Sequence, residues 1–312
     1  MAFTVCVARS AAVNSQATRT SRAARGASVT PARPVTARRE IAPVSGTPSG
    51  RGSVKTDVAV PTGADFYASL YPESSSDGVL RLGNVVPNFG PTETTMGVIE
   101  DFHKEIEGSW TILFSHPADF TPVCTTEIGK LAISYDELAS LGCKIYTLSA
   151  NSLGDHQTWL NDVVAHCENK VEIKFPIIAD ESREVSVKYG MLDPNNKDGD
   201  DLPLTIRAVF IIGPDLKLKL SLNYPASVGR NMEEIVRCVK ALKLSADNSI
   251  ATPANWPNNH TELNMDGKEM KGSVFLLPTV STEDAEKFFP GFKTCNVPSG
   301  KDYLRLVHVD EK

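Results

Sequence analysis

Short apolar runs alternate with segments of helical spacing between residues 80 and 250, and this order constrains the fold more than any other feature of the sequence. Apolar runs of this length predict strands, and amphipathic segments predict helices. A short turn at residues 213–215 separates two of the runs, which favours a hairpin. The expected strands are Trp110–Phe114, Lys144–Ser149, Phe175–Ala179, Arg207–Ile212 and Leu216–Leu222, and the expected helices are 122–141, Gly154–Cys167, Glu184–Tyr189 and Asn231–Leu244. Such alternation predicts an α/β fold in which helices cover a central sheet.

The composition changes on both sides of this region. Residues 1–55 carry eight Arg and one Lys against a single acid, Glu40, and contain too little apolar surface to fold alone. They are expected to be a transit peptide for the chloroplast or, as the alternative, the mitochondrion, although a basic tail that stays attached is a second interpretation. Residues 56–79 are expected to be a linker. Residues 80–250 then form the main domain, and residues 251–312 a small C-terminal domain.

Charge and cysteine usage exclude several classes of protein. The formal net charge of −6 argues against a general nucleic-acid binder. No apolar run approaches the roughly 20 residues that a membrane-spanning helix needs. The six cysteines are scattered and include no C-x-x-C pair, which argues against a metal site and against a disulfide-rich secreted scaffold. A reducing compartment with one or two working thiols fits this pattern better.

Cys124 differs from the other cysteines because it is expected in the first turn of a helix. Pro122 suits the first helical position, and Thr121 suits the N-cap. Backbone N–H groups in a first turn lack partners and lie at the positive end of the helix dipole, which favours a thiolate. The same donors could stabilise charge on an oxygen that departs from a peroxide. The simpler interpretation is a buried cysteine that begins an ordinary helix.

The residues around Cys124 resemble the peroxiredoxin fingerprint Pro-x-x-x-Thr-x-x-Cys, with Pro117 and Thr121 at the matching positions. The full run 114–127 is similar to the one-cysteine, six-type branch of the AhpC/TSA superfamily. The similarity spans residues 80–312 and includes the segments 175–178, 190–194, 224–226, 229–231, 251–256 and 298–305. It implies a thioredoxin-like fold, with a central mixed β-sheet flanked by helices, followed by a small C-terminal α+β domain.

The resemblance also implies an activity and a set of site residues. The activity is that of a thiol peroxidase, which reduces hydrogen peroxide and organic hydroperoxides through a cysteine sulfenic acid, without metal or other cofactor. This activity serves antioxidant defence and redox homeostasis. Cys124 matches the peroxidatic nucleophile, Thr121 the hydroxyl that orients the peroxide, and Arg207 the arginine that stabilises the thiolate. The supporting residues that match are Pro117, His116, Glu127 and Arg230.

The way in which Cys124 is regenerated follows from what the chain lacks. Two-cysteine relatives carry a resolving cysteine in a Val-Cys-Pro setting near the C-terminus, and this tripeptide does not occur here. An external thiol, glutathione or thioredoxin, is therefore expected to reduce the sulfenic acid. Cys295 stays open as an internal candidate, whereas Cys143, Cys167 and Cys238 are interpreted as packing residues. The family also implies a homodimer.

Three other functions compete with this interpretation. A peroxide sensor or chaperone would keep the sulfenic acid as a switch. A thioredoxin-like disulfide oxidoreductase is disfavoured because that chemistry usually needs two close cysteines. Six-type relatives can also carry a phospholipase site, for which Ser109, His103 and Asp215 are the matching positions. Neither Glu107 nor Thr111 preserves the flanking glycine of the Gly-x-Ser-x-Gly turn, so this activity is not favoured.

Overall fold

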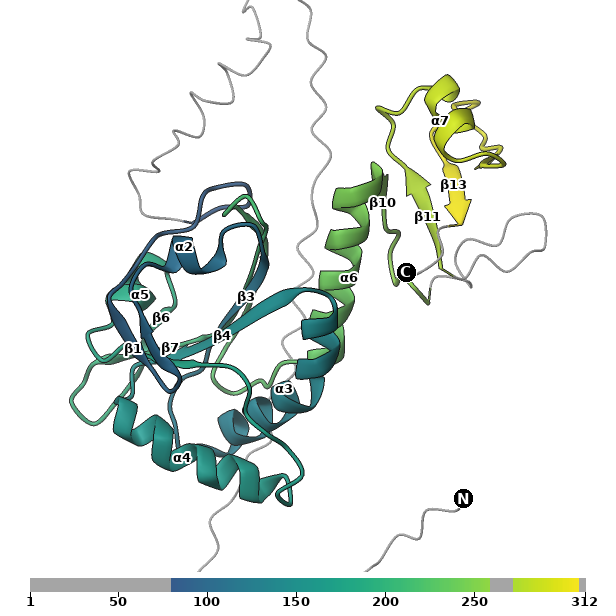
Figure 1. Cartoon of the computed structure of the whole chain (residues 1–312). Coiled ribbons are helices and arrows are strands. Elements are labelled where there is room, and N and C mark those ends of the chain that lie inside the picture. Colours follow the sequence, from purple (N-terminus) through teal and green to yellow (C-terminus); the bar gives the residue numbers. More distant parts are fainter. Residues whose placement is uncertain (1–79, 259–271, 309–312) are drawn as a thin grey trace, which may run out of the picture. The chain divides into compact units, whose positions relative to one another are not determined.

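The computed structural model describes residues 80–258 and 272–308 of the 312-residue chain (Figure 1). The expected transit peptide at 1–55 and the expected linker at 56–79 lie outside the described residues. The region 80–250 contains a seven-stranded sheet with helices on both faces. The α/β fold expected from alternating strands and helices is therefore confirmed.

The central sheet is mixed, because three parallel strands are extended on both sides by antiparallel ones. β3 pairs parallel with β4, and β4 with β5. β8 and β9 add antiparallel strands beside β3, while β1 and β2 do so beside β5. The order is β2-β1-β5-β4-β3-β8-β9, with bounds β1 Thr92–Thr94, β2 Gly97–Ile99, β3 Trp110–Ser115, β4 Cys143–Ser149, β5 Ile177–Ala179, β8 Arg207–Ile212 and β9 Leu218–Tyr224.

Helices bury both faces of this sheet. On one face, α3 (Pro122–Ser140), α4 (Leu153–His166) and α6 (Met232–Asn248) pack a shared core against β3, β4 and β8. On the other face, α2 (Phe102–Ile106) and α5 (Glu184–Lys188) form a second core. All six residues of β3 and of β8 are buried, as expected for central strands covered on both sides.

Local sequence signals explain where the long helices begin. Ser152 caps α4 in a reciprocal capping box with Asp155. The Asn231 side chain accepts hydrogen bonds from the first N–H groups of α6. Thr121 precedes α3, and Pro122 occupies its first turn. The long helices begin within one residue of the expected positions, and α6 continues to Asn248, beyond the expected end at Leu244. The expected strands, including the β8–β9 hairpin, agree with the structure within two residues at each end.

Several short elements were not expected from the sequence. β1, β2 and α2 precede the first expected strand, and β6 (Leu192–Lys197) pairs with β7 (Pro203–Thr205) in a separate two-stranded sheet. β1 and β2 have three residues each, and α2 has five. Segments of this length contain too few residues to establish a hydrophobic period.

The C-terminal residues form a second sheet with its own core. Its strand order is β10-β11-β13-β12, with bounds β10 Ile250–Ala251, β11 Ser273–Leu276, β12 Lys293–Thr294 and β13 Arg305–His308. α7 (Thr282–Phe288) contributes Ala285 to the core, which also contains Trp256 and Val274. This sheet and helix form the expected C-terminal α+β unit. β10 spans residues 250 and 251, and the domain boundary between these residues stays a prediction.

The parallel strands place several polar residues at one edge of the sheet. The carboxyl ends of β3, β4 and β5 lie side by side, and they lead into His116, Asn151 and Asp180. In open α/β sheets, sites form outside this edge. α3 starts there, directly after the loop that follows β3. No helix within the described ranges is long and apolar enough to cross a membrane.

Candidate active site

Cys124 is the third residue of α3, as the sequence predicted. Thr121 has the extended backbone of an N-cap residue, and its carbonyl accepts the N–H of Thr125 at 3.0 Å. Its side chain does not cap the helix, because the hydroxyl donates to the Ala118 carbonyl at 2.9 Å. The first-turn N–H groups therefore stay available, and Cys124 lies among them. Its relative exposure is 0%, so contact with a peroxide requires local movement of the residues that cover it.

Arg207 reaches Cys124 from the neighbouring strand β8. Its Nη1 lies 3.3 Å from the Cys124 Sγ and also donates to Glu127 Oε2 at 2.8 Å. The rest of the guanidinium donates to the Ala226 carbonyl, through Nε at 3.0 Å and Nη2 at 2.7 Å. The Arg207 guanidinium is thus held by the Glu127 carboxylate and the Ala226 carbonyl, with one N–H directed at the sulfur. A guanidinium in this position favours the thiolate through both charge and hydrogen bonding.

Glu127 and Arg230 complete a buried ionic cluster. Arg230 donates to Glu127 through its backbone N at 2.7 Å, Nε at 3.0 Å and Nη2 at 2.8 Å. Its Nη1 donates to the carbonyls of Ser115 at 2.8 Å and Ala208 at 2.7 Å. Glu127, Arg207 and Arg230 are each less than a tenth exposed. Two guanidinium charges meet one carboxylate, so the cluster has one positive charge in excess, which a thiolate at Cys124 would balance.

The same contacts determine how Glu127 ionises. Burial by itself raises the pKa of the Glu127 carboxyl, but the charge of Arg230, its hydrogen bonds and the charge of Arg207 together hold that pKa below its usual value. Burial lowers the pKa of Arg230 against the opposing charge of Glu127. Arginine ordinarily titrates so far above neutrality that the guanidinium stays charged. The cluster is therefore ionic at neutral pH.

His116 and Pro117 lie in the loop between β3 and α3, and both are buried. The His116 Nε2 is 2.8 Å from Asp119 Oδ1, while its Nδ1 has no hydrogen-bond partner among the described residues. Burial lowers the pKa of His116 by more than the Asp119 hydrogen bond raises it. Asp119 also contacts His156 on α4, at 2.6 Å. Neither Asp119 nor His156 was predicted from the sequence, although His156 shares the buried face of α4 with Trp159 and Val163.

The set considered for a phospholipase is not assembled into a triad. Ser109 precedes β3, His103 lies in α2, and Asp215 lies in the β8–β9 turn. The His103 ring contacts the Val86 carbonyl at 2.7 Å, and Asp215 pairs with Lys219 at 2.7 Å. Within the described part of the chain, no hydrogen bond joins Ser109 to His103 or Asp215. A serine hydrolase requires such a contact to activate its nucleophile.

Three of the other described cysteines, Cys143, Cys167 and Cys238, occupy packing positions. Cys143 begins β4, Cys167 follows the last turn of α4, and Cys238 lies on α6. Burial raises the pKa of the Cys143 thiol to about 11. Burial and the neighbouring Glu234 raise that of Cys238 to about 11. Both thiols are therefore protonated at neutral pH, which suits packing rather than nucleophilic attack.

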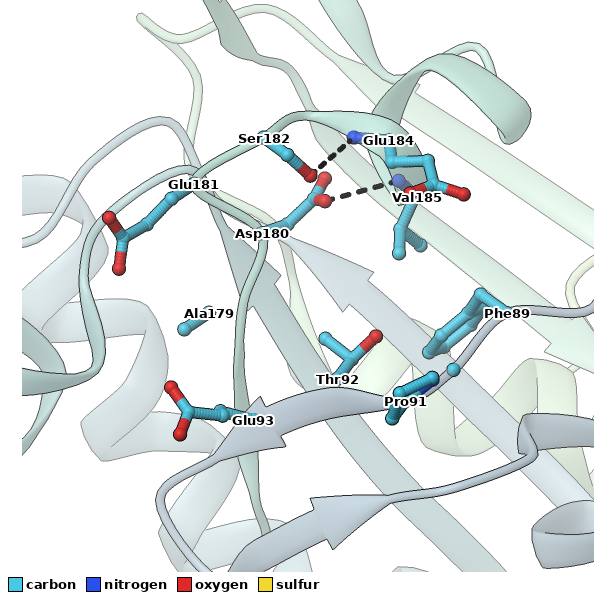
Figure 2. Close-up of a pocket in the computed structure, with 11 residues that line it drawn as sticks. Phe89, Pro91, Thr92, Glu93, Ala179, Asp180, Glu181, Ser182, Glu184 and Val185 are labelled. Carbon is cyan, nitrogen blue, oxygen red and sulfur yellow. Dashed lines mark hydrogen bonds between the residues drawn. The ribbon is translucent and has the colours of Figure 1, made fainter.

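A separate hollow of about 270 Å³ lies between β1 and the segment that joins β5 to α5 (Figure 2). Its lining includes the carboxylates of Glu93, Glu181 and Glu184. The Asp180 carboxylate accepts the N–H of Val185 at 3.1 Å, so it already has a backbone hydrogen-bond partner. No residue of the Cys124 cluster lines this hollow. Within the described ranges, no group of three His, Cys, Asp or Glu side chains is arranged to hold a metal ion.

Known proteins share both the sequence and the fold of this chain. The AhpC/TSA family profile matches residues 82–221. Peroxiredoxin-6 from Homo sapiens is 48% identical over 233 residues, which cover 74% of this chain and 98% of the human protein. Peroxiredoxin-6 from Gallus gallus is 48% identical over 235 residues, with 74% of this chain and 99% of that protein covered.

Solved structures of peroxiredoxins superpose on this chain. A cysteine-to-serine mutant of peroxiredoxin 6 from Arenicola marina superposes with a TM-score of 0.66 at 43% identity, over 75% of this chain and all of that one. A yeast mitochondrial 1-Cys peroxiredoxin, described for thiol resolving via glutathione/thioredoxin systems, superposes with a TM-score of 0.60 at 35% identity. The coverage is 73% of this chain and 99% of the yeast chain.

Proposed function

From the chain's membership of the AhpC/TSA family, on the one-cysteine, peroxiredoxin-6 branch, and from its activity as a thiol peroxidase, we propose a role for one residue. Cys124 is the nucleophile that attacks peroxide. The thioredoxin-like fold expected from the sequence is confirmed by the same relatives. The observation that carries the proposal is the 3.3 Å contact between Arg207 Nη1 and the Cys124 sulfur at the start of α3.

The first step is a displacement at oxygen. The Cys124 thiolate attacks the terminal oxygen of the hydroperoxide, an S–O bond forms, and the O–O bond breaks. The departing alkoxide or hydroxide takes a proton and leaves as alcohol or water. Cys124 becomes a sulfenic acid. The sulfur supplies the two electrons that reduce the peroxide, so this step needs no metal, flavin or other redox group.

The surrounding residues have distinct roles in this step. Arg207 stabilises the thiolate, while Glu127 and Arg230 hold Arg207 in place. The Thr121 hydroxyl directs its hydrogen to Ala118, which leaves its lone pairs free to accept the O–H of a bound peroxide. First-turn N–H groups of α3 stabilise the charge that develops on the departing oxygen. Pro117 stiffens the loop that joins β3 to α3.

External thiols complete the cycle in two steps: one thiol attacks the sulfenic acid sulfur and expels water to form a mixed disulfide with Cys124, and a second thiol attacks that disulfide, which releases the Cys124 thiol and a disulfide of the reductant. Glutathione and thioredoxin are the candidate reductants, supported by the yeast 1-Cys relative. Cys295 is buried in the C-terminal unit and is the internal alternative. We expect Cys295→Ser to leave turnover unchanged, because an external thiol does not need it. The measurement is steady-state peroxide consumption by the mature protein, with glutathione and thioredoxin assayed side by side.

The same assay separates an enzyme from a sensor. Turnover with either reductant supports the peroxidase cycle. Consumption of a single equivalent of peroxide, without recycling by either thiol, would favour a peroxide sensor or chaperone. Loss of turnover in Cys295→Ser would assign the resolving role to that cysteine instead.

The chloroplast is the proposed compartment, with the mitochondrion as the alternative. The basic leader at residues 1–55 supports this proposal through its composition. A homodimer is proposed because dimers are usual in the family. A phospholipase side activity finds little support, since Ser109 lacks a base within the described part of the chain. Mass spectrometry of the mature N-terminus from isolated organelles would test the leader and the compartment together.

A further inference from the structure

A buried histidine–carboxylate–histidine cluster lies beside the candidate active site. His116 Nε2 is 2.8 Å from Asp119 Oδ1, and His156 Nδ1 is 2.6 Å from Asp119 Oδ2. All three side chains have 0% exposure. Each carboxylate oxygen therefore contacts one imidazole, and Oδ1 also accepts the Ser149 hydroxyl at 3.5 Å. Charged groups buried in this way are costly unless they are fully paired, so a cluster like this one fixes its members in a single arrangement.

Asp119 is anchored by its backbone as well as by its side chain. Its N–H donates to Asn151 Oδ1 at 3.0 Å, just after β4. Burial raises the pKa of Asp119, but the hydrogen bonds to His116 and His156 lower it further and leave it below its usual value. The side chain is thus a carboxylate at neutral pH. Asp119 thus links the loop after β3 to the segment that follows β4 and to α4.

The hydrogen bonds of His156 make this connection rigid. Its Nδ1 faces the Asp119 carboxylate, and its Nε2 faces the Ile178 carbonyl at 3.2 Å. Both partners are acceptors, and each ring nitrogen faces one of them. Through these two contacts, His156 connects Asp119 both to α4 and to β5.

The residue after Asp119 has a backbone conformation that needs support. Phe120 has a φ of 55°, in the left-handed region that non-glycine residues rarely adopt. Its side chain is 51% exposed, so packing of the ring holds this turn only weakly. Strained residues of this kind persist where the surrounding structure fixes them, and they cluster at functional sites. Phe120 directly precedes Thr121, the N-cap of the helix that carries Cys124.

The cluster also contacts the first turn of α3 by a second route. The Trp159 ring packs on the His116 ring, with centroids 5.1 Å apart. Its Nε1 donates to Thr125 Oγ1 at 3.1 Å, one residue beyond Cys124. A shift of the His116 ring would therefore disturb the start of α3 in two ways: through the loop, and through Trp159 of α4 and its hydrogen bond to Thr125.

We propose that Asp119 and His156 are positioning residues for the reaction of Cys124 with peroxide, because together they hold the strained Phe120 turn that aims Thr121 and the first turn of α3. The proposal rests on the proposed function of Cys124. It assigns neither residue a contact with the substrate. Their effect is transmitted through Phe120, Thr121 and the His116–Trp159 packing.

The test compares two reactions of the same sulfur in Asp119→Asn and His156→Gln. Peroxide reduction needs Thr121 and the helix N–H groups in place, whereas alkylation of Cys124 by iodoacetamide needs a reactive thiolate and the same local opening, but no alignment of Thr121 with an O–O bond. We expect peroxide reduction in stopped flow to slow by about a hundredfold, the usual cost of an ångström-scale misplacement. The alkylation rate should change far less. Matched controls are Asp136→Asn, exposed on α3, and His166→Gln, exposed on α4, which should leave both rates unchanged.

A rescue experiment separates positioning from general damage to the fold. Glycine adopts the left-handed region without strain, so adding Phe120→Gly to Asp119→Asn should recover about tenfold of the lost peroxide rate. Equal losses of peroxide reduction and alkylation, an unchanged peroxide rate in both single variants, or no recovery in the double variant would each overturn the proposal. If Asp119→Asn does not fold, His156→Gln decides the comparison of rates. Slow peroxide reduction by the unaltered protein would instead contradict the proposed function itself.

Discussion

Replacing Cys124 with serine should reduce peroxide consumption to the level of the reaction without protein. A serine hydroxyl stays protonated at neutral pH, even beside Arg207, and is a poor nucleophile towards oxygen. Every other feature of the site, including the Glu127–Arg230 pairing, should remain. The loss would therefore report the sulfur alone. The measurement is stopped-flow peroxide consumption by the variant and the unaltered protein at equal concentration.

Cys143→Ser and Cys238→Ser are the matched controls for this result. A thiol whose pKa is about 11 is ionised to about one part in ten thousand at pH 7. Both thiols are also buried, so neither should contribute to the rate. Consumption that persists at the unaltered rate in Cys124→Ser would show that another residue does the chemistry.

Glu127→Gln should produce the largest loss of stability among single changes at the site. The carboxylate accepts four hydrogen bonds from two buried arginines, so its replacement leaves their charges without compensation. Removing one partner of a buried ion pair costs about 3 kcal/mol or more of unfolding free energy. The exposed Glu137→Gln on the same helix removes only a surface pair with Lys240 and should cost less than about 1 kcal/mol.

The pH dependence of this loss follows from the pKa of Glu127. That pKa lies below its ordinary value of 4.5 in the folded protein, so folding favours the ionised form. The stabilisation is fully present above the unfolded value and disappears as the pH falls through the folded one. The difference in unfolding free energy between the unaltered protein and Glu127→Gln should therefore shrink below about pH 4.5. Urea unfolding followed by circular dichroism across this range measures it, and a difference that is independent of pH would contradict the ionic assignment.

The sequence predicted the part of the site that depends on local structure. Pro122 and the N-cap position of Thr121 identified the start of α3, and Cys124 followed from them. Arg207 and Arg230 lie 83 and 106 residues further along the chain, and only the family resemblance connected them to the sulfur. Both arginines contact the site because β3 pairs with β8, and a pairing between strands so far apart in the chain cannot be predicted from the residues near either one.

The remaining features were missed for two physical reasons. The strands β1 and β2 and the helix α2 are too short to show a period. Asp119 and His156 are separated by 37 residues and meet only because β4 and α4 fold beside the loop after β3. A polar residue on the buried face of α4, at His156, was the one sign that a partner had to exist in the core.

Labelling of the sulfenic acid tests the role of Cys124 most directly. The reduced mature protein is treated with one equivalent of hydrogen peroxide, trapped with dimedone and mapped by peptide mass spectrometry. We expect a single adduct, on the peptide that contains Cys124, formed on the timescale of peroxide consumption. An adduct on another cysteine, or consumption of the peroxide while Cys124 stays an unmodified thiol, would contradict its assignment as the nucleophile.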